Sequence, residues 1–213
     1  MDTITTILIF MFSIIIHEVA HAYSAYLFGD TTAKDEGRIT LNPVPHIDLW
    51  WSILLPAFLF ISSHGRFIFG GAKPVPINPL RFYNRRLGIS LVSAAGPLSN
   101  ISIALISALI ANLVLAIGLH SVFLNLFFGK LILYNLLLAG FNLIPIPPLD
   151  GSKLLVYFFP HEYEYAVARM EYLGFFILII AIQFGLFETV VSNFIIPFMI
   201  YISPFEMLRL FFG

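Results

Sequence analysis

The chain has no cysteine among its 213 residues, which excludes disulfides and thiolate metal sites. Any strong metal ligand must then be a histidine or a carboxylate. Charge is also scarce, because only 11% of residues are charged, the net charge is −1, and no basic face is available for nucleic acid. The sequence is instead 59% hydrophobic, with a mean hydropathy of +0.93. This composition predicts an all-α, polytopic membrane protein that has the lipid bilayer, and no nucleic acid, as a partner.

Six apolar segments follow one another along the chain, at 4–28, 49–63, 87–119, 122–143, 172–187 and 190–212. The first is long enough to cross a bilayer, whereas the second is short, has Pro56 in its middle, and either spans or re-enters. Pro97 is expected to kink or interrupt the third. We expect one membrane-embedded unit over 1–213 without a cleaved signal peptide, with a core at about 4–158 and accessory segments at 160–213.

Two polar stretches separate the first three apolar segments. The first stretch, 30–48, contains a weak alternation at 37–41 that predicts a short β-like strand. The second, 64–88, holds five of the eleven Lys and Arg residues and no acid, so the positive-inside rule predicts that it is cytosolic. Its Pro74-Val75-Pro76 run is either a rigid surface loop or an extended edge that lines a site and pairs with an unwound peptide strand.

The first apolar segment contains His17-Glu18-Val19-Ala20-His21. Ionisable groups at membrane depth are costly, so this cluster indicates a functional site. On a helix, histidines four residues apart share one face, as two Zn²⁺ ligands must, and the glutamate beside them is a candidate general base. A chance match in this composition has a probability of roughly half a percent for a pattern of this kind. We interpret the stretch as half of a zinc site that faces an internal cavity rather than lipid.

A catalytic zinc ion needs a third protein ligand and one open position for water. Asp150 is the best candidate, because it is the only acid in the range 49–161 and lies in an apolar segment. Three prolines at 145–148 forbid a regular helix and predict extended backbone, which is tolerated at membrane depth only where it lines a cavity. Gly151 permits a sharp turn after the carboxylate. Taken alone, this pattern is more typical of a surface turn that caps the next helix; taken with the two histidines, it favours a metal ligand.

The two motifs, His17–His21 and 142–151 (Asn-Leu-Ile-Pro-Ile-Pro-Pro-Leu-Asp-Gly), together resemble the paired signature of the site-2 protease family of intramembrane zinc metalloproteases. Three stretches between them, at 37–43, 71–76 and 95–100, are similar to its compact prokaryotic members. The resemblance covers residues 10–155. The chain has no insertion long enough for a PDZ domain or a C-terminal sensor domain, so what larger members imply about regulation does not transfer.

The resemblance implies one Zn²⁺ ion per chain, bound by His17, His21 and Asp150, with Glu18 activating the water. It also implies cleavage of peptide bonds in transmembrane-helix protein substrates, as in regulated intramembrane proteolysis. The protein is then expected to be a multi-pass enzyme of a prokaryotic cell membrane, with its site nearer the cytosolic face. Water must reach the metal, which predicts a polar channel whose walls are the loops 30–48 and 64–88.

Two further residues are candidates for catalytic roles. His46 can stabilise the tetrahedral oxyanion or shuttle a proton, or it is a solvated loop histidine. Asn142 can hold the substrate backbone or the oxyanion, or it simply terminates a helix.

Two other functional classes remain open. One is a different intramembrane zinc hydrolase, such as a prenyl-protein protease, although such enzymes usually take further ligands from helix-borne Glu or His. The other is a non-catalytic zinc-binding membrane protein or transporter, although the chain has no repeated broken helices in matching halves.

Overall fold

The computed structural model describes residues 3–48, 54, 58, 61 and 72–212. Three of its helices are long and apolar enough to cross a membrane: α1 (Thr3–Leu27), α4 (Arg85–Ala116) and α5 (Val122–Asn142). They correspond to the predicted segments 4–28, 87–119 and 122–143, and all regular structure in the described residues is helical. The segment 49–63 lies outside the described residues, apart from 54, 58 and 61.

The predicted strand at 37–41 is wrong. After the short helix α2 (Thr32–Asp35) the chain forms turns and bends, and the next regular element is the 3₁₀ helix η1 (Val44–His46). Gly37 has a positive φ of 65°, and the Arg38 N–H donates to Ala33 O, so the chain folds back on α2. This backbone cannot offer the straight edge that a β ladder requires.

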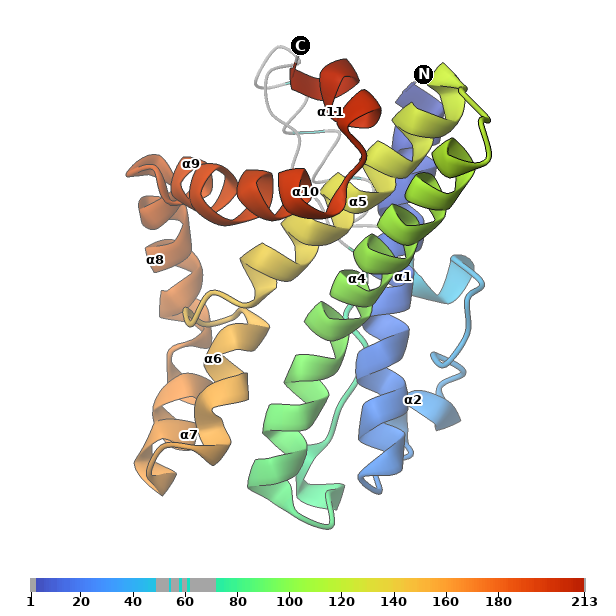
Figure 1. Ribbon diagram of the computed structural model, residues 1–213. Coiled ribbons are helices and arrows are strands. Elements are labelled where there is room, and N and C mark those ends of the chain that lie inside the picture. The colour runs from blue at the N-terminus through green and yellow to red at the C-terminus, as the bar shows by residue number, and fades with distance from the viewer. Residues whose placement is uncertain (1–2, 49–53, 55–57, 59–60, 62–71, 213) are drawn as a thin grey trace.

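α4 begins where Asn84 caps it, since the Asn84 side chain accepts a hydrogen bond from the Leu87 N–H. The helix then runs unbroken through Pro97, so the predicted interruption there does not occur (Figure 1). Pro97 is buried, and next to it Gly96 lies directly against the histidines of α1. The helix therefore passes close to α1 at the position of its proline.

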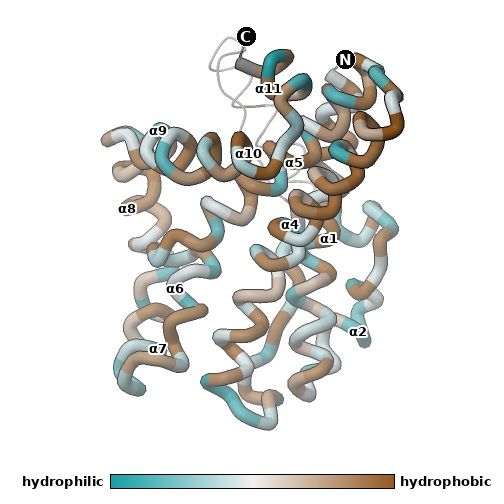
Figure 2. Tube along the Cα trace, in the orientation of Figure 1, coloured by the Kyte–Doolittle hydropathy of each residue, from teal (hydrophilic) through white to brown (hydrophobic). Residues whose placement is uncertain are grey.

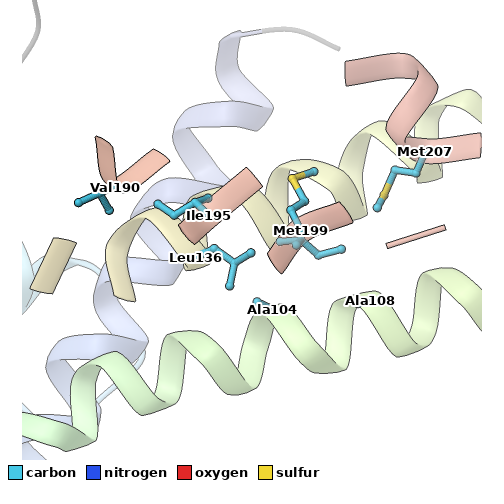
Figure 3. Close-up of a cluster of buried hydrophobic side chains, with 8 residues drawn as sticks. Ala104, Ala108, Leu136, Val190, Ile195, Met199 and Met207 are labelled. Carbon is cyan, nitrogen blue, oxygen red and sulfur yellow. The ribbon is translucent and has the colours of Figure 1, made fainter. Parts of the chain in front are cut away.

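α1, α4 and α5 form the centre of the molecule, with α5 crossing the other two obliquely (Figure 1). Small side chains on α4, those of Ala104 and Ala108, allow α5 to approach closely, as is usual for helices in lipid. A buried apolar cluster fills the junction of α4 and α5 with the C-terminal part of the chain (Figure 3); its residues are Ala104, Ala108, Ile132, Leu136, Val190, Ile195, Met199 and Met207.

The C-terminal part of the chain is more broken than predicted. The segment 172–187 corresponds to α8 (Glu171–Gln183), which is bent by 72° from the preceding α7 (His161–Arg169). The segment 190–212 is divided between two helices. The first, Leu186–Ile202, is continuous and consists of α9 (Leu186–Val190), the π-helical η5 (Val191–Ile195) and α10 (Ile196–Ile202); the second is α11 (Phe205–Phe212).

α9 and α10 run across the end of α8, and α11 turns away from α10 (Figure 1). Gly185, with a positive φ of 88°, makes the first turn, and Ser203 in extended conformation before Pro204 makes the second. The described residues therefore provide three candidate spans, or up to four if α7 and α8 count as one. Figure 2 shows the apolar residues concentrated on α4, α5, α8 and α10 and polar residues around α2.

Candidate metal centre

α1 places the two histidines of the motif on one buried face. His17 and His21 are each 6% exposed, and their Nε2 atoms lie 3.0 Å apart. The rings stand nearly perpendicular, with an interplanar angle of 85°. The face that carries them is covered by α4 rather than by solvent or lipid, as the helical spacing of four residues predicts for an inward-facing pair.

Asp150, the first residue of the short helix α6 (Asp150–Leu154), completes a group of three. Its Oδ2 lies 3.3 Å from His17 Nε2 and 3.2 Å from His21 Nε2, and the three candidate ligand atoms are all within 4.8 Å of one another. The residues before it form turns and bends, so the predicted extended backbone at 145–148 is wrong. Proline prevents the helix here, as expected, but the chain reverses direction compactly.

Gly151 is required for a different reason from the predicted one. It lies inside α6 with ordinary helical backbone, not in a sharp turn. A Cβ atom at this position would lie 2.3 Å from Leu143 O and 2.5 Å from Ile144 O. The missing side chain allows α6 to pack against the end of α5, and this close approach brings Asp150 to the histidines.

The outer nitrogen of each histidine ring is held by α4. His21 Nδ1 donates to Val92 O at 2.7 Å, and His17 Nδ1 donates to Asn100 Oδ1 at 2.7 Å. Because the Val92 carbonyl can only accept, the proton of His21 is on Nδ1. With both protons on Nδ1, the lone pairs of the two Nε2 atoms face Asp150, which is the tautomer that a metal ligand needs.

A buried polar network sets the orientation of the Asn100 amide. Asn100 Nδ2 donates to Ser13 O at 3.2 Å and to Asn135 Oδ1 at 2.8 Å, which leaves Oδ1 to face His17. Asn135 Nδ2 in turn donates to Ser13 Oγ at 2.8 Å. All three side chains are fully buried between α1, α4 and α5. The network therefore links the ligand His17 to all three long helices.

The donor set fits a zinc ion. Asp150 Oδ2 is buried and accepts no hydrogen bond from the described residues, although two imidazole lone pairs point at it. Three acceptors in one small space repel one another unless a cation lies between them. Two histidines and one carboxylate are three ligands of the kind found at catalytic zinc sites, which keep a fourth position open for water.

Glu18, next to the first ligand on α1, is half-buried and points to the loop segment 72–78. Its Oε2 accepts a hydrogen bond from the Val75 N–H at 2.8 Å. The described residues of this segment have no helical structure before the 3₁₀ helix η3 (Pro79–Arg81), which agrees with the predicted effect of its prolines.

The structure does not bring His46 or Asn142 into the three-residue group. His46 is only 2% exposed, so it is not a solvated loop histidine; its Nε2 donates to Thr40 O at 2.9 Å. Asn142 is the last residue of α5, and its Nδ2 donates to Leu138 O at 2.9 Å. The catalytic roles suggested for both residues remain predictions.

A cavity of about 320 Å³ lies next to the centre. It is lined by residues of α4, α6 and α7, including Val92, whose carbonyl holds His21, and Lys153, one turn after Asp150. Two ion pairs line it as well, Arg85–Glu164 at 2.6 Å and Lys153–Glu171 at 2.9 Å. The wall also includes Ile77, Pro79 and Phe82 of the stretch 64–88, and no residue of 30–48. Of the two loops that were predicted to line a channel, only 64–88 therefore contributes to this cavity.

The chain is similar to several proteins that are named as zinc metalloproteases. It is 37% identical over 93% of its length to "Putative zinc metalloprotease YwhC" of Bacillus subtilis, of which it covers 87%. It is 32% identical over 80% of its length to "Putative zinc metalloprotease Rip2" of Mycolicibacterium smegmatis, of which it covers 63%. With the Rip2 protein of Mycobacterium tuberculosis the identity is 35% over 67% of this chain and 52% of that protein. No protein-family model matches the chain, and no solved structure matches it.

Proposed function

The chain belongs to the site-2 protease family of zinc metalloproteases, and from this premise we propose that it hydrolyses peptide bonds in or near transmembrane helices of membrane proteins. The observation that carries the proposal is the convergence of His17, His21 and Asp150 beside Glu18, on a helix apolar enough to cross a membrane. Such ionisable groups at membrane depth are costly and are retained for function.

His17, His21 and Asp150 are the ligands of the zinc ion in this proposal, which when bound acts as a Lewis acid and lowers the pKa of water at the site to about 7. The Glu18 carboxylate accepts the proton of the attacking water and delivers it to the nitrogen of the leaving amine. Only Oε2 of Glu18 is engaged by the Val75 amide, so Oε1 is the atom that takes the proton.

The substrate must unwind locally, because a transmembrane helix hides its scissile carbonyls in its own hydrogen bonds. Substrates with helix-breaking residues near the cleaved bond are therefore favoured. In this proposal the chain crosses the membrane more than once, which the length and apolar character of α1, α4 and α5 support. The basic stretch 64–88 supports a cytosolic location for the adjoining end of α4.

The test uses the full chain in liposomes with a panel of fluorescent single-span peptides that carry an Asn-Gly or Pro break at different depths. Wild-type protein is expected to cleave at least one peptide, whereas Glu18→Gln retains zinc and loses cleavage by at least about 10³-fold, the upper part of the range for a proton-transfer group. Cleavage by Glu18→Gln at the wild-type rate, or no cleavage of any peptide, would contradict the proposal.

A further inference from the structure

The Pro74-Val75-Pro76 segment has few main-chain donors, and most of them are used. Its two prolines have no N–H, Lys73 N–H donates to His46 O at 2.8 Å, and Val75 N–H donates to Glu18. Asn78 N–H donates to Asp30 Oδ2 at 2.6 Å. Among residues 73–78, the Ile77 amide is then the only N–H for which the described residues provide no hydrogen-bond partner. The segment is thus poorly equipped to form a ladder with a substrate strand and well equipped to hold Glu18.

Arg38 holds the same segment from its other side. Its Nη2 donates to Lys73 O at 2.6 Å and to Pro74 O at 3.3 Å, the two carbonyls that directly precede the Val75 amide. The Arg38 side chain is only 3% exposed and pairs with no carboxylate among the described residues. A buried cation without a paired anion is costly. The hydrogen bonds to these two carbonyls are the contacts that offset this cost for Arg38.

We propose that Arg38 is a positioning residue for the catalytic base: by fixing the carbonyls of Lys73 and Pro74, it aims the single N–H of the Pro-Val-Pro run at Glu18 Oε2. The contact holds one carboxylate oxygen so that the other faces the water. This inference rests on the proposed role of Glu18. A misplacement of about 1 Å at a catalytic group can lower the rate by about 10²-fold. The hydrogen bonds of Arg38 to Lys73 O and Pro74 O, called the Arg38 clasp below, are therefore expected to have a measurable effect on the rate.

Arg38→Met keeps the apolar stem of the side chain and removes its donors. It is expected to lower kcat on the best-cleaved panel peptide by about 10- to 100-fold. KM and zinc affinity are expected to stay within about threefold of wild type, because the clasp touches neither the ligands nor the cavity. Arg38→Lys retains a donor and the charge, so its kcat should lie between the values for wild type and Arg38→Met.

Val75→Pro deletes the amide itself, and Val75→Ala is its matched control, because it also reduces the packing of the buried side chain but keeps the amide that contacts Glu18. We expect Val75→Pro to lower kcat as Arg38→Met does, and the double variant to be no worse than either, since both act through one hydrogen bond. Additive losses, a weakened zinc affinity in Arg38→Met, or an equal effect of Val75→Ala would overturn the inference.

A readout without catalysis separates this inference from the proposed function. Amide hydrogen exchange at Val75 is expected to be at least about tenfold faster in Arg38→Met than in wild type, while exchange within α1 is unchanged. Unchanged exchange at Val75 would refute the clasp even if the protein proves to be a protease. An inactive Glu18→Gln variant beside a fully active Arg38→Met variant would refute the positioning role alone.

Discussion

The residues on the two sides of the metal centre are held by different kinds of contact. Behind the ligands, the contacts run between helices: His17 to Asn100 and then to Asn135 and Ser13, and His21 to the α4 carbonyl of Val92. Behind Glu18, the contacts run through loop main chain: the Val75 amide binds Glu18, Arg38 binds the carbonyl of Lys73, and the buried Asp30 accepts a hydrogen bond from the Asn78 N–H.

The difference follows from what each side has to do. Metal ligands must stay within a few tenths of an ångström of their positions. Long helices that pack closely at Ser, Asn and Gly residues provide that rigidity. The base has to meet a substrate that enters and leaves, and a loop segment held by hydrogen bonds can adjust by small movements. Disturbing the helix side should therefore weaken zinc binding, and disturbing the loop side should slow turnover.

The largest effect is expected from Gly96→Ala on the helix side. The new Cβ would lie 2.3 Å from His21 Nε2 and 2.6 Å from His17 Cε1, and neither ring can retreat without losing its Nδ1 hydrogen bond. We expect zinc affinity to fall by at least about 100-fold, the upper range for changes around a metal ligand, as measured by competition with a chelator.

Gly140→Ala is the matched control, because its Cβ would meet only side-chain ends, Ile195 Cδ1 at 3.3 Å and Val190 Cγ1 at 3.5 Å, and no ligand. It should bind zinc like wild type. Wild-type zinc affinity in Gly96→Ala would show that the helix side is not rigid.

Asn100→Leu comes next. It removes the acceptor of His17 Nδ1 and leaves two other buried polar partners, on Ser13 and Asn135, without their donor. Loss of such an outer partner typically weakens metal affinity by about 10- to 100-fold. Asn112→Leu removes a similar pair of α4 hydrogen bonds, to Ala108 O and Ile202 O, far from the centre and should leave zinc affinity unchanged. Equal affinities in the two variants would contradict the role of the network.

The smallest effect is expected on the loop side, from Asp30. Burial by itself raises the pKa of the Asp30 carboxyl. Hydrogen bonds from the Asn78 N–H and from Thr32, together with nearby Arg81, lower the pKa by more than burial raises it, so the net pKa lies below its usual value. A lowered folded-state pKa stabilises the fold above the unfolded value of about 3.9, and this contribution is lost as the pH falls through the folded-state pKa.

Asp30→Asn is therefore expected to unfold more easily at pH 7, by about 1–3 kcal/mol for loss of charge-assisted hydrogen bonds. The difference in Tm between the two proteins, measured at a series of pH values, should narrow below about pH 4. A constant difference across this range would show that the Asp30 charge does not hold the loop.

The local part of the centre was predictable. The spacing of His17 and His21 is a helical period, and helices formed by long apolar runs are the most reliable element to predict. Asp150 was found by elimination, because one acid in a long apolar stretch has few other uses. The strand at 37–41 and the extended chain at 145–148 were wrong, because each rested on a short pattern that tertiary contacts override. Of the six apolar segments, three are confirmed as candidate spans among the described residues.

The supporting residues escaped prediction. Asn100, Asn135 and Arg38 act across separations of 83, 35 and 35 residues respectively, on His17, Asn100 and Lys73. Asn100 and Arg38 lie in stretches that resemble the family, and the two asparagines are polar residues in apolar helices, but neither signal names a partner. Arg38 sits in a turn-rich stretch where an arginine is ordinarily a solvated surface residue.

By itself, the sequence determined the chemistry of the centre: without cysteine, the ligands had to be histidine and carboxylate, and an α-helix had to put the two histidines on one face. Only the tertiary structure decided which polar groups stand behind them and which loop amide meets Glu18. The physical reason is range. Side-chain direction along a helix follows from neighbouring residues, whereas the approach of α4, α5 and the 73–78 segment depends on packing over the whole chain.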